Sequence, residues 1–268
     1  MITAKAAAKI NLFLHVGERR DDGFHPLQSL AVFADAGDML EFHPAEELSL
    51  SVRGPFAGSL PGEDDDNLIL KAARALNATA RIVLTKNLPV ASGIGGGSAD
   101  AAATLRALGQ GGERHLLELD ASLGSDVPVC LLSKPAWMEG RGEILTPIAQ
   151  VPRLPMLLVN PGVAVPTAAV FRALTSRRGT AMAIPKTIDL AFLRAAGNDL
   201  EAPALAIQPV IADVLGEIDA QPGSLLVRMS GSGATCFGLF DKPERVNAAA
   251  RKIALAHPNW WVCATRVV

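Results

Sequence analysis

The chain lacks the short motifs that mark the commonest nucleotide-binding and kinase sites. No Gly-Lys-Ser or Gly-Lys-Thr occurs in its 268 residues, which excludes a Walker A loop, and no G-x-G-x-x-G run marks a dinucleotide site. The HRD and DFG signatures of protein kinases are also missing. Any phosphate chemistry must therefore use another kind of loop.

Concentrated charge, cysteine and long apolar runs are scarce as well. The net charge of -2 and the lack of dense basic clusters argue against a nucleic-acid partner. No segment is apolar for long enough to cross a bilayer, and the apolar run 10–16 lacks the cleavage site of a signal peptide. Widely spaced cysteines in apolar runs predict buried free thiols and a cytoplasmic location. These cysteines are Cys130, Cys236 and Cys263.

The most informative segment is 80–108, which has the pattern of a strand, a glycine-rich loop and a helix. The β-rich run is 81–85, and the strong helix formers are 101–108. Between them lie Gly93, Gly95, Gly96 and Gly97. Glycines remove side chains where backbone must approach a ligand, and a helix start offers N–H groups and a positive dipole end, so the segment predicts a phosphate cradle. The alternative is simple capping of the helix by Ser98 or Asp100.

The remaining predicted elements change in type along the chain without a regular repeat. Helices are predicted at 68–77 with Asn67 as its cap, and at 115–123, 167–174, 243–256 and, as two or three short pieces, within 192–219. Strands are predicted at 3–16, 28–33, 39–43, 48–52, 156–159, 225–229 and 235–240, and as a pair around Trp137 and Ile144, with a tight turn at 124–128. A loop at 149–155 is the predicted boundary between domains 1–150 and 151–268. The mixture predicts an α+β fold.

The glycine loop resembles one motif of a known enzyme family. The run PVASGIGGGSADAA, with Pro89, Ser98 and Ala99, is similar to the second motif of the GHMP kinases (galactokinase, homoserine, mevalonate and phosphomevalonate kinases), in which a glycine loop follows a proline and ends in Ser-Ser-Ala. Ala99 replaces the second serine of many members, so Ser98 alone would supply a hydroxyl to the phosphates. The runs LGSDVPVCL and MSGSGATCFGLF resemble two further motifs of the family. The first places Asp126 at the position of the catalytic carboxylate.

The N-terminal segment resembles one branch of the family, the kinases of 4-diphosphocytidyl-2-C-methyl-D-erythritol. That branch has a Lys-x-Asn-Leu run and then an Arg-x-Asp-Gly-Tyr-His turn; here Lys9 and Asn11 match the run, and RDDGFH matches the turn with Phe24 in place of tyrosine. The resemblance implies ATP-dependent phosphorylation of the 2-hydroxyl of this substrate in the non-mevalonate isoprenoid pathway. Lys9 and Asp126 would be the catalytic pair, although each residue taken alone is typical of an ordinary strand or turn.

The resemblance also implies the binding residues. ATP, accompanied by Mg²⁺, would be bound by Asn67, Val90, Ala91, Ser92, Gly93, Ile94, Gly95, Gly96, Gly97, Ser98, Ala99 and Asp100. The acceptor would be bound by Asn11, Phe24, His25, Thr167, Phe171, Gly231, Ser232 and Gly233. An aromatic face would stack on cytosine while His25 bonds its edge. No residue is assigned to the metal, and the oligomeric state is left open.

The family fold would consist of two domains with the active site between them: an N-terminal layer like domain 2 of ribosomal protein S5 and a C-terminal ferredoxin-like α/β sandwich. Two other functions stay open at this point. One is a GHMP kinase for homoserine or a mevalonate derivative, which gives no reason for the RDDGFH segment. The other is a non-catalytic nucleotide sensor, which gives no reason to retain both Lys9 and Asp126.

Overall fold

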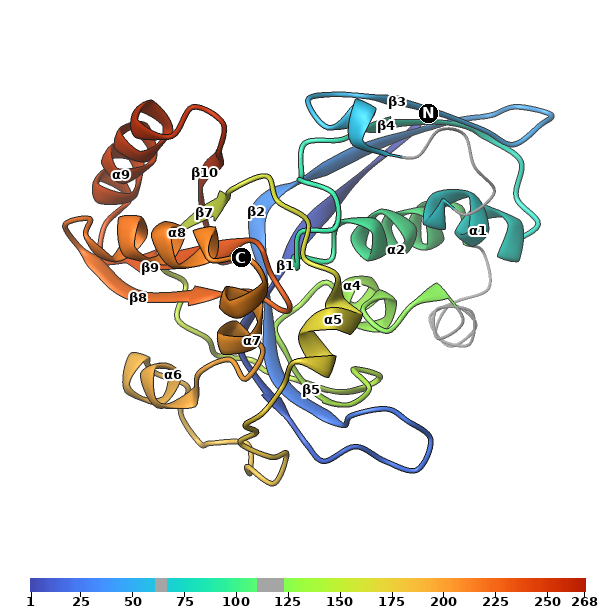
Figure 1. Ribbon diagram of the computed structural model, residues 1–268. Helices are drawn as coiled ribbons and strands as arrows, with labels where there is room; N and C mark the ends of the chain where they lie inside the picture. The colour runs from blue at the N-terminus through green and yellow to red at the C-terminus, as the bar shows by residue number, and fades with distance from the viewer. Residues whose placement is uncertain (61–66, 110–122) are drawn as a thin grey trace. The chain divides into compact units, whose positions relative to one another are not determined.

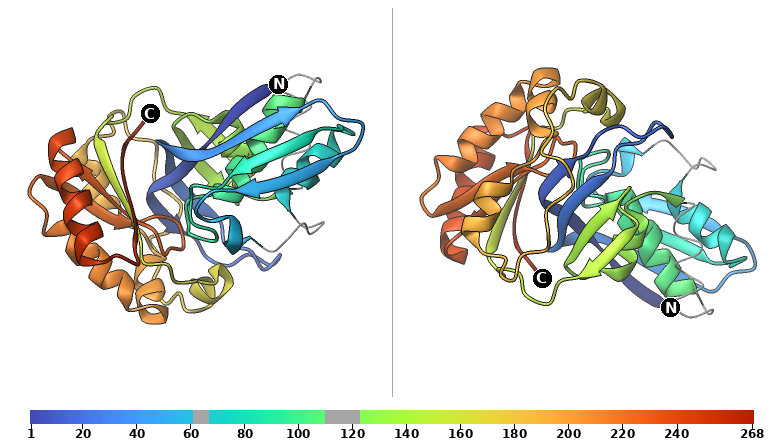
Figure 2. Two further views of the ribbon diagram at one scale, coloured as in Figure 1. Left: turned by 90° about the horizontal axis from the view of Figure 1, so that it is seen from above. Right: turned by 90° about the horizontal axis from the view of Figure 1, so that it is seen from below.

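A computed structural model describes residues 1–60, 67–109 and 123–268, and these form two compact units (Figures 1 and 2). The first unit contains Met1–Lys9, Ala36–Val90 and Gly95–Ser133, and the second contains Ile10–Asp35, Ala91–Ile94 and Lys134–Val268. Each unit is thus built from three stretches of chain. A single cut after residue 150 is not tested by this division and stays a prediction.

The first unit places helices beside a small mixed sheet. Its strands are β3 (Ser49–Arg53), β4 (Arg81–Thr85) and parts of the long strands β1 (Ile2–Val16) and β2 (Leu27–His43), and its helices are α1 (Leu68–Ala75), α2 (Gly96–Leu108) and α4 (Val127–Leu132), with a 3₁₀ turn at Ala57–Ser59. Strand β4 pairs antiparallel with β2 and parallel with β3. Helix α2 packs between α1 and α4, so its first turn is held firmly in the unit.

The second unit contains an antiparallel sheet covered by helices. Its remaining elements are β5 (Ala136–Gly140), β6 (Ile144–Pro147), β7 (Pro155–Asn160), α5 (Thr167–Arg172), α6 (Leu190–Ala196), α7 (Glu201–Ile207), α8 (Val210–Asp219), β8 (Ser224–Met229), β9 (Cys236–Phe240), α9 (Pro243–Ala256) and β10 (Trp261–Arg266). The strand order is β10-β7-β9-β8, and α8 and α9 pack on this sheet (Figure 2). Buried aliphatic side chains fill the space between sheet and helices. The predicted α+β class is confirmed.

Most predicted elements are present, but strand β2 was wrongly predicted as two strands. The polar residues and glycine of the ADAGD run indicated a turn, yet β2 continues through them. A Cβ built on Gly37 would lie 2.5 Å from the Ala6 carbonyl oxygen, so this glycine permits close approach to β1. Asp38 is fully buried within this continuous strand.

Two further differences concern helices. Helix α2 begins at Gly96, five residues earlier than predicted, and the helix α4 directly after Asp126 was missed because it is short and begins with Val-Pro. Strand β10 was also missed. Most of the helix predicted at 115–123 lies outside the described residues.

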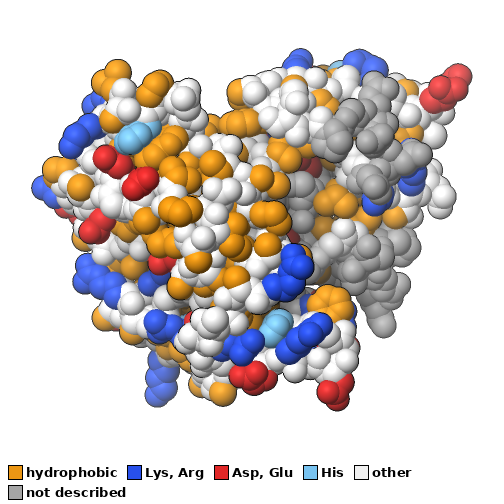
Figure 3. All heavy atoms as spheres, in the orientation of Figure 1, with side chains coloured by type: hydrophobic (Ala, Val, Ile, Leu, Met, Phe, Trp, Pro, Cys, Tyr) orange, Lys and Arg blue, Asp and Glu red, His pale blue; other side chains and the backbone are white. Residues whose placement is uncertain are grey.

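The cysteines are free, as predicted, but Cys263 is only partly buried because it lies on the edge strand β10. Within the described ranges, no helix combines the length and apolar character that a bilayer crossing needs. On the face shown in Figure 3, basic, acidic and apolar side chains are interspersed over the described residues.

Candidate active site

A buried ammonium and a half-exposed carboxylate meet in the first unit. Lys9 lies on β1 and Asp126 directly precedes α4, and Lys9 Nζ is 3.0 Å from Asp126 Oδ2. The lysine side chain is 4% exposed and the aspartate 34% exposed. The carboxylate can therefore reach a bound molecule while the ammonium holds it from behind. The fold brings these two residues together although they are more than a hundred positions apart.

The start of α2 lies beside this ion pair. Its N-cap is Gly95, which has a left-handed backbone (φ 64°) and supplies no side-chain cap. A Cβ built there would lie 3.3 Å from Lys9 Cε and 3.7 Å from Asp126 Oδ2. The first turn of a thirteen-residue helix concentrates N–H donors and the positive end of the dipole. The N-terminus of a helix and a Lys–Asp ion pair are thus neighbours in one unit.

Two of the loop glycines also make room for other parts of the protein. A Cβ on Gly93 would lie 2.5 Å from the Ser230 carbonyl oxygen, and one on Gly96 would lie 3.2 Å from Lys86 Nζ. On Gly97 it would make an ordinary contact, 3.6 Å from Leu68 Cδ1. The missing side chains of Gly93 and Gly96 therefore make room for other parts of the protein, and close approach of this loop to a phosphate stays a prediction.

The alternative that Ser98 or Asp100 merely caps the helix is wrong, because Gly95 occupies the cap position. Ser98 is the third helical residue and is half-buried. The Asp100 carboxylate bonds to Lys86 at 2.8 Å, so only the backbone of Asp100 remains for contact with a nucleotide. Asn67 is confirmed as the cap of α1: its Oδ1 accepts from the Ile69 N–H at 2.9 Å.

The other predicted loop residues lie before and within the first turn of α2. Val90 and Ala91 are at least partly exposed, and Ala91 has a positive φ of 50°. Ser92, Ile94 and Ala99 are buried. A ligand would therefore contact these three residues only through their backbone atoms.

Lys86 holds two buried carboxylates below the start of α2. Its Nζ bonds to Asp38 Oδ2 and, at 2.8 Å, to Asp100 Oδ2, and all three side chains are at most 4% exposed. Burial alone would lower the pKa of Lys86, but the carboxylates of Asp100 and Asp38 raise it above its usual value. Burial raises the pKa of Asp100 to about 7, against the opposing effect of Lys86. We call Asp38, Lys86 and Asp100 the Lys86 cluster.

The second unit gathers several of the residues predicted to bind the acceptor. The Asn11 backbone N–H donates to Ser230 Oγ at 3.1 Å, and Ser230 Oγ donates to the Gly93 carbonyl oxygen at 3.1 Å. A Cβ on Gly231 would lie 2.8 Å from that same carbonyl oxygen, which explains the glycine. Residues 230–235 join β8 to β9 and form the glycine hairpin, in which the Ser232 hydroxyl is 2.9 Å from the hydroxyl of Thr167 at the start of α5. Gly233 follows in the hairpin and has a positive φ of 88°.

The predicted base-binding residues are only partly brought together. The His25 and Phe171 rings are stacked, with centroids 5.8 Å apart, and His25 Nδ1 lies 2.9 Å from the Gly17 carbonyl oxygen. A donor at Nδ1 leaves Nε2 as the acceptor of the neutral ring. Phe24 is 52% exposed and, among the described residues, makes no ring contact with either of them. Instead, the Arg141 guanidinium lies 3.8 Å above its ring.

Sequence reasoning missed three residues of these groups. Asp38 and Lys86 are far apart in the chain, and each resembles a charged residue at the end of an apolar run. Arg141, which also bonds to Asp22 Oδ2 at 2.9 Å, lies in an ordinary Gly-Arg-Gly turn. No local signal distinguishes any of them from a solvated charge.

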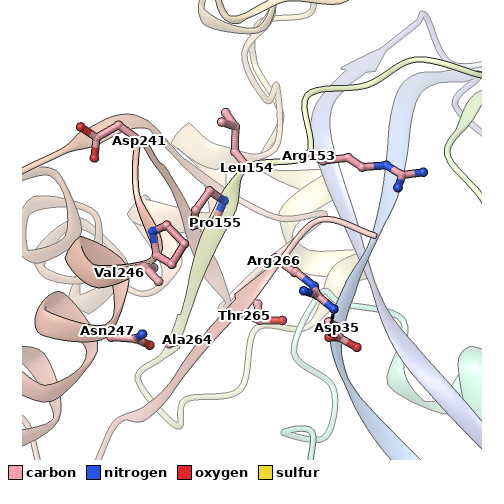
Figure 4. Close-up of a pocket in the computed structure, with 11 residues that line it drawn as sticks. Asp35, Arg153, Leu154, Pro155, Asp241, Val246, Asn247, Ala264, Thr265 and Arg266 are labelled. Atoms are coloured by element: carbon pink, nitrogen blue, oxygen red, sulfur yellow. Dashed lines mark ion pairs between the residues drawn. The ribbon is translucent and has the colours of Figure 1, made fainter.

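A groove of about 630 Å³ in the second unit contains none of the predicted site residues (Figure 4). It lies along β7, β10 and the start of α9, with Arg266 Nη2 3.1 Å from Asp35 Oδ2. Its arginines and aspartates give no preference for one sign of charge. Across the described residues, no three His, Cys, Asp or Glu side chains are placed to hold a metal ion.

Two family models match this sequence. The model described as the GHMP kinases N terminal domain matches residues 67–134, which include the glycine loop and Asp126. The model described as GHMP kinases C terminal matches residues 186–259, which include the glycine hairpin.

Similar proteins span the whole chain. A 4-diphosphocytidyl-2-C-methyl-D-erythritol kinase of Cereibacter sphaeroides is 53% identical over 98% of each chain, and that of Parvibaculum lavamentivorans is 49% identical over 97% of this chain and 96% of its own. A crystal structure of 4-(cytidine 5'-diphospho)-2C-methyl-D-erythritol kinase superposes with a TM-score of 0.80 at 33% identity, covering all of both chains. A homoserine kinase from Cytophaga hutchinsonii shares the fold alone, with a TM-score of 0.68 at 20% identity, over all of this chain and 94% of its own.

Proposed function

The chain belongs to the GHMP kinase family, and we propose that it transfers the γ-phosphoryl group of ATP to the 2-hydroxyl of 4-diphosphocytidyl-2-C-methyl-D-erythritol. The family fold of two α+β domains is shared with the similar kinases described above. Relatives that resemble this chain along its whole length carry the name of that activity. The product would be the 2-phosphate of the acceptor. Its formation is a step of the non-mevalonate isoprenoid pathway.

One observation in the structure carries the proposal. The Lys9–Asp126 pair, at 3.0 Å, adjoins the uncapped N-terminus of α2. Phosphoryl transfer to an alcohol needs an acceptor for the hydroxyl proton, a cation for the developing charge and donors for the phosphates. These three requirements are met by Asp126, Lys9 and the first turn of α2.

The reaction follows from this placement. The acceptor oxygen forms a bond to the γ-phosphorus as the bond from that phosphorus to the β–γ bridging oxygen breaks, and ADP leaves. Asp126 takes the hydroxyl proton or orients the hydroxyl, because loose transition states of this kind demand little deprotonation. Lys9 orients the carboxylate through the ion pair and stabilises the transferring group. The N–H groups of α2 hold the phosphates in line.

Magnesium would enter bound to ATP. Mg²⁺ usually keeps several waters and is held by one or two carboxylates together with substrate phosphates, so it needs no cage of protein ligands. Magnesium would supply charge neutralisation on the β- and γ-phosphates.

The cytidine would be recognised in the second unit. With Nδ1 turned to the Gly17 carbonyl, His25 offers Nε2 as an acceptor for the amino group of cytosine. Phe171 packs against the His25 ring and fixes its plane. Because Arg141 covers one face of Phe24, a base would stack on the opposite face. The loss of a tyrosine hydroxyl at Phe24 leaves this stacking intact.

Product analysis tests the proposal. Purified protein with Mg²⁺, ATP and 4-diphosphocytidyl-2-C-methyl-D-erythritol should form ADP and a new phosphomonoester, whose attachment at the 2-oxygen is read from carbon–phosphorus couplings in NMR. Protein with ATP alone is the control for simple hydrolysis. Tight ATP binding without phosphoryl transfer would instead identify a nucleotide sensor.

A further inference from the structure

The Lys86 cluster lies next to the proposed phosphate cradle. It contains three ionisable side chains that are closed to solvent. Lys86 is 2% exposed, Asp38 is 0% exposed and Asp100 is 4% exposed at the side chain. With both carboxylates ionised the cluster carries one net negative charge. Buried groups avoid an unbalanced charge by taking up a proton, and a single proton would make this cluster neutral.

The hydrogen bonds decide which carboxylate receives that proton. Asp38 Oδ1 accepts from the backbone N–H groups of Asn87 at 2.6 Å and Leu88 at 2.8 Å, and its Oδ2 accepts from Lys86. Donors of this kind stabilise the ionised form. Asp100 accepts from the Lys86 ammonium at Oδ2, its carboxyl group also faces the Asp38 carboxylate as a hydrogen-bond partner, and its buried Oδ1 has no partner among the described residues. The proton therefore belongs on Asp100.

The cluster lies directly below the donors for the phosphates. A Cβ on Gly96, the first residue of α2, would lie 3.2 Å from Lys86 Nζ and 3.8 Å from Asp38 Oδ2. Asp100 is one turn further along the same helix. A negative charge at this place opposes the positive end of the helix dipole and repels a bound triphosphate. A neutral cluster leaves the dipole undiminished.

We propose that Asp100 is protonated when ATP is bound, so that the state of the Lys86 cluster sets the affinity of the α2 N-terminus for the triphosphate. Asp100 acts here as a positioning residue, because it works through the helix start and not through contact with substrate. The inference rests on the proposed function, since it assumes that the phosphates bind at α2. The raised pKa of Asp100, about 7, puts this protonation in the physiological range.

Other titratable and charged groups lie on the elements packed around Asp100. Helix α1 packs on α2 through apolar residues, Ile69, Leu70, Ala72 and Ala73. On α4, burial raises the pKa of the Cys130 thiol, which keeps it neutral. Further charged groups on or beside these helices are the Lys9–Asp126 pair, Lys71 and Arg74 on α1, and Arg106, which donates to the Cys130 carbonyl oxygen at 2.6 Å. Lys86 stays charged because its pKa is raised.

The test compares wild type with Asp100→Asn, which keeps the shape of the side chain and is neutral at every pH. Calorimetric ATP titrations between pH 6 and 8.5 should show the wild-type Kd rising relative to the variant Kd by about threefold to thirtyfold, the effect of one nearby charge. ATP itself changes its protonation in the same pH range, which affects the Kd of both proteins equally. The ratio of the wild-type Kd to the variant Kd therefore reports only the protonation of the protein. Asp213→Asn, an exposed aspartate in the first turn of α8, is the matched control and should follow wild type.

Proton uptake gives a second measurement on the wild-type protein. ATP titrations above pH 7 in buffers of different ionisation enthalpy should reveal protons taken up by wild type in excess of those taken up by Asp100→Asn. If Asp100→Asn does not fold, the carboxyl carbon-13 resonance of Asp100 in wild type should show a higher pKa with ATP than without it. Parallel pH profiles, or an unchanged Asp100 resonance, would overturn the inference. A wild type that binds no ATP would instead overturn the proposed function.

Discussion

Replacing Asp126 with asparagine should separate catalysis from binding. The variant keeps the size of the side chain but loses the negative charge that lies beside Lys9 and that we propose faces the acceptor hydroxyl. Loss of an acid–base group usually lowers turnover by about 10²- to 10⁴-fold, or about 3–5 kcal/mol in the activation barrier. Because the carboxylate is 34% exposed and Lys9 is buried, the ion pair contributes only about 1–3 kcal/mol to folding, between the values for exposed and buried pairs. The variant should therefore fold and bind ATP.

Single-turnover phosphoryl transfer is the appropriate assay, because it reports the chemical step without product release. Asp241→Asn offers a matched control: Asp241 is 32% exposed and lies 2.8 Å from Arg245, a geometry close to that of Asp126 and Lys9 but on the surface near α9. It should keep wild-type turnover. Transfer by Asp126→Asn within threefold of wild type would reduce Asp126 to a turn residue and refute the assignment of the pair.

Three further changes test other parts of the site. Lys86→Met leaves two buried carboxylates without their cation, so the free energy of unfolding measured in urea should fall by about 3–5 kcal/mol. As a control, Lys134→Met removes an exposed lysine and should change the free energy of unfolding by less than about 0.5 kcal/mol. Equal effects of the two substitutions would contradict the ion cluster. Gly95→Ala places an alanine in the left-handed backbone region and displaces Lys9, so the free energy of unfolding should fall by about 1–2 kcal/mol, and both the melting temperature and kcat should decrease. Gly97→Ala is the control and should leave the melting temperature unchanged or raise it. His25→Ala should lower kcat/KM for the cytidylated acceptor but not for 2-C-methyl-D-erythritol 4-phosphate, and an unchanged ratio would remove His25 from recognition.

Most helices and strands were predictable from the sequence because the residues that favour them lie within or next to the element itself. Helix α9 and strand β4 have the predicted bounds, and Asn67 caps α1 as its position indicated. The continuity of β2 was not predictable in this way, because Gly37 is selected by contact with a strand more than thirty residues away.

The candidate site shows the same division between local and distant information. The glycine loop and its helix were evident from 80–108, but the room that Gly96 leaves for Lys86 was not, because Lys86 approaches it through the fold. The Lys9–Asp126 pair was expected only from family resemblance, because no spacing rule joins residues so far apart. No sequence pattern indicated the Lys86 cluster. Its three charged side chains interact because the fold buries them together, and this burial cannot be read from the local sequence.

The most direct test of the proposed activity is the ratio of kcat/KM values for different acceptors with one preparation of enzyme and ATP. The acceptors are 4-diphosphocytidyl-2-C-methyl-D-erythritol, 2-C-methyl-D-erythritol 4-phosphate, homoserine and mevalonate. Base stacking worth about 1–3 kcal/mol predicts that the cytidylated acceptor exceeds its uncytidylated counterpart by about 5- to 150-fold, with homoserine and mevalonate lower still. A preference for homoserine or mevalonate would contradict the assignment.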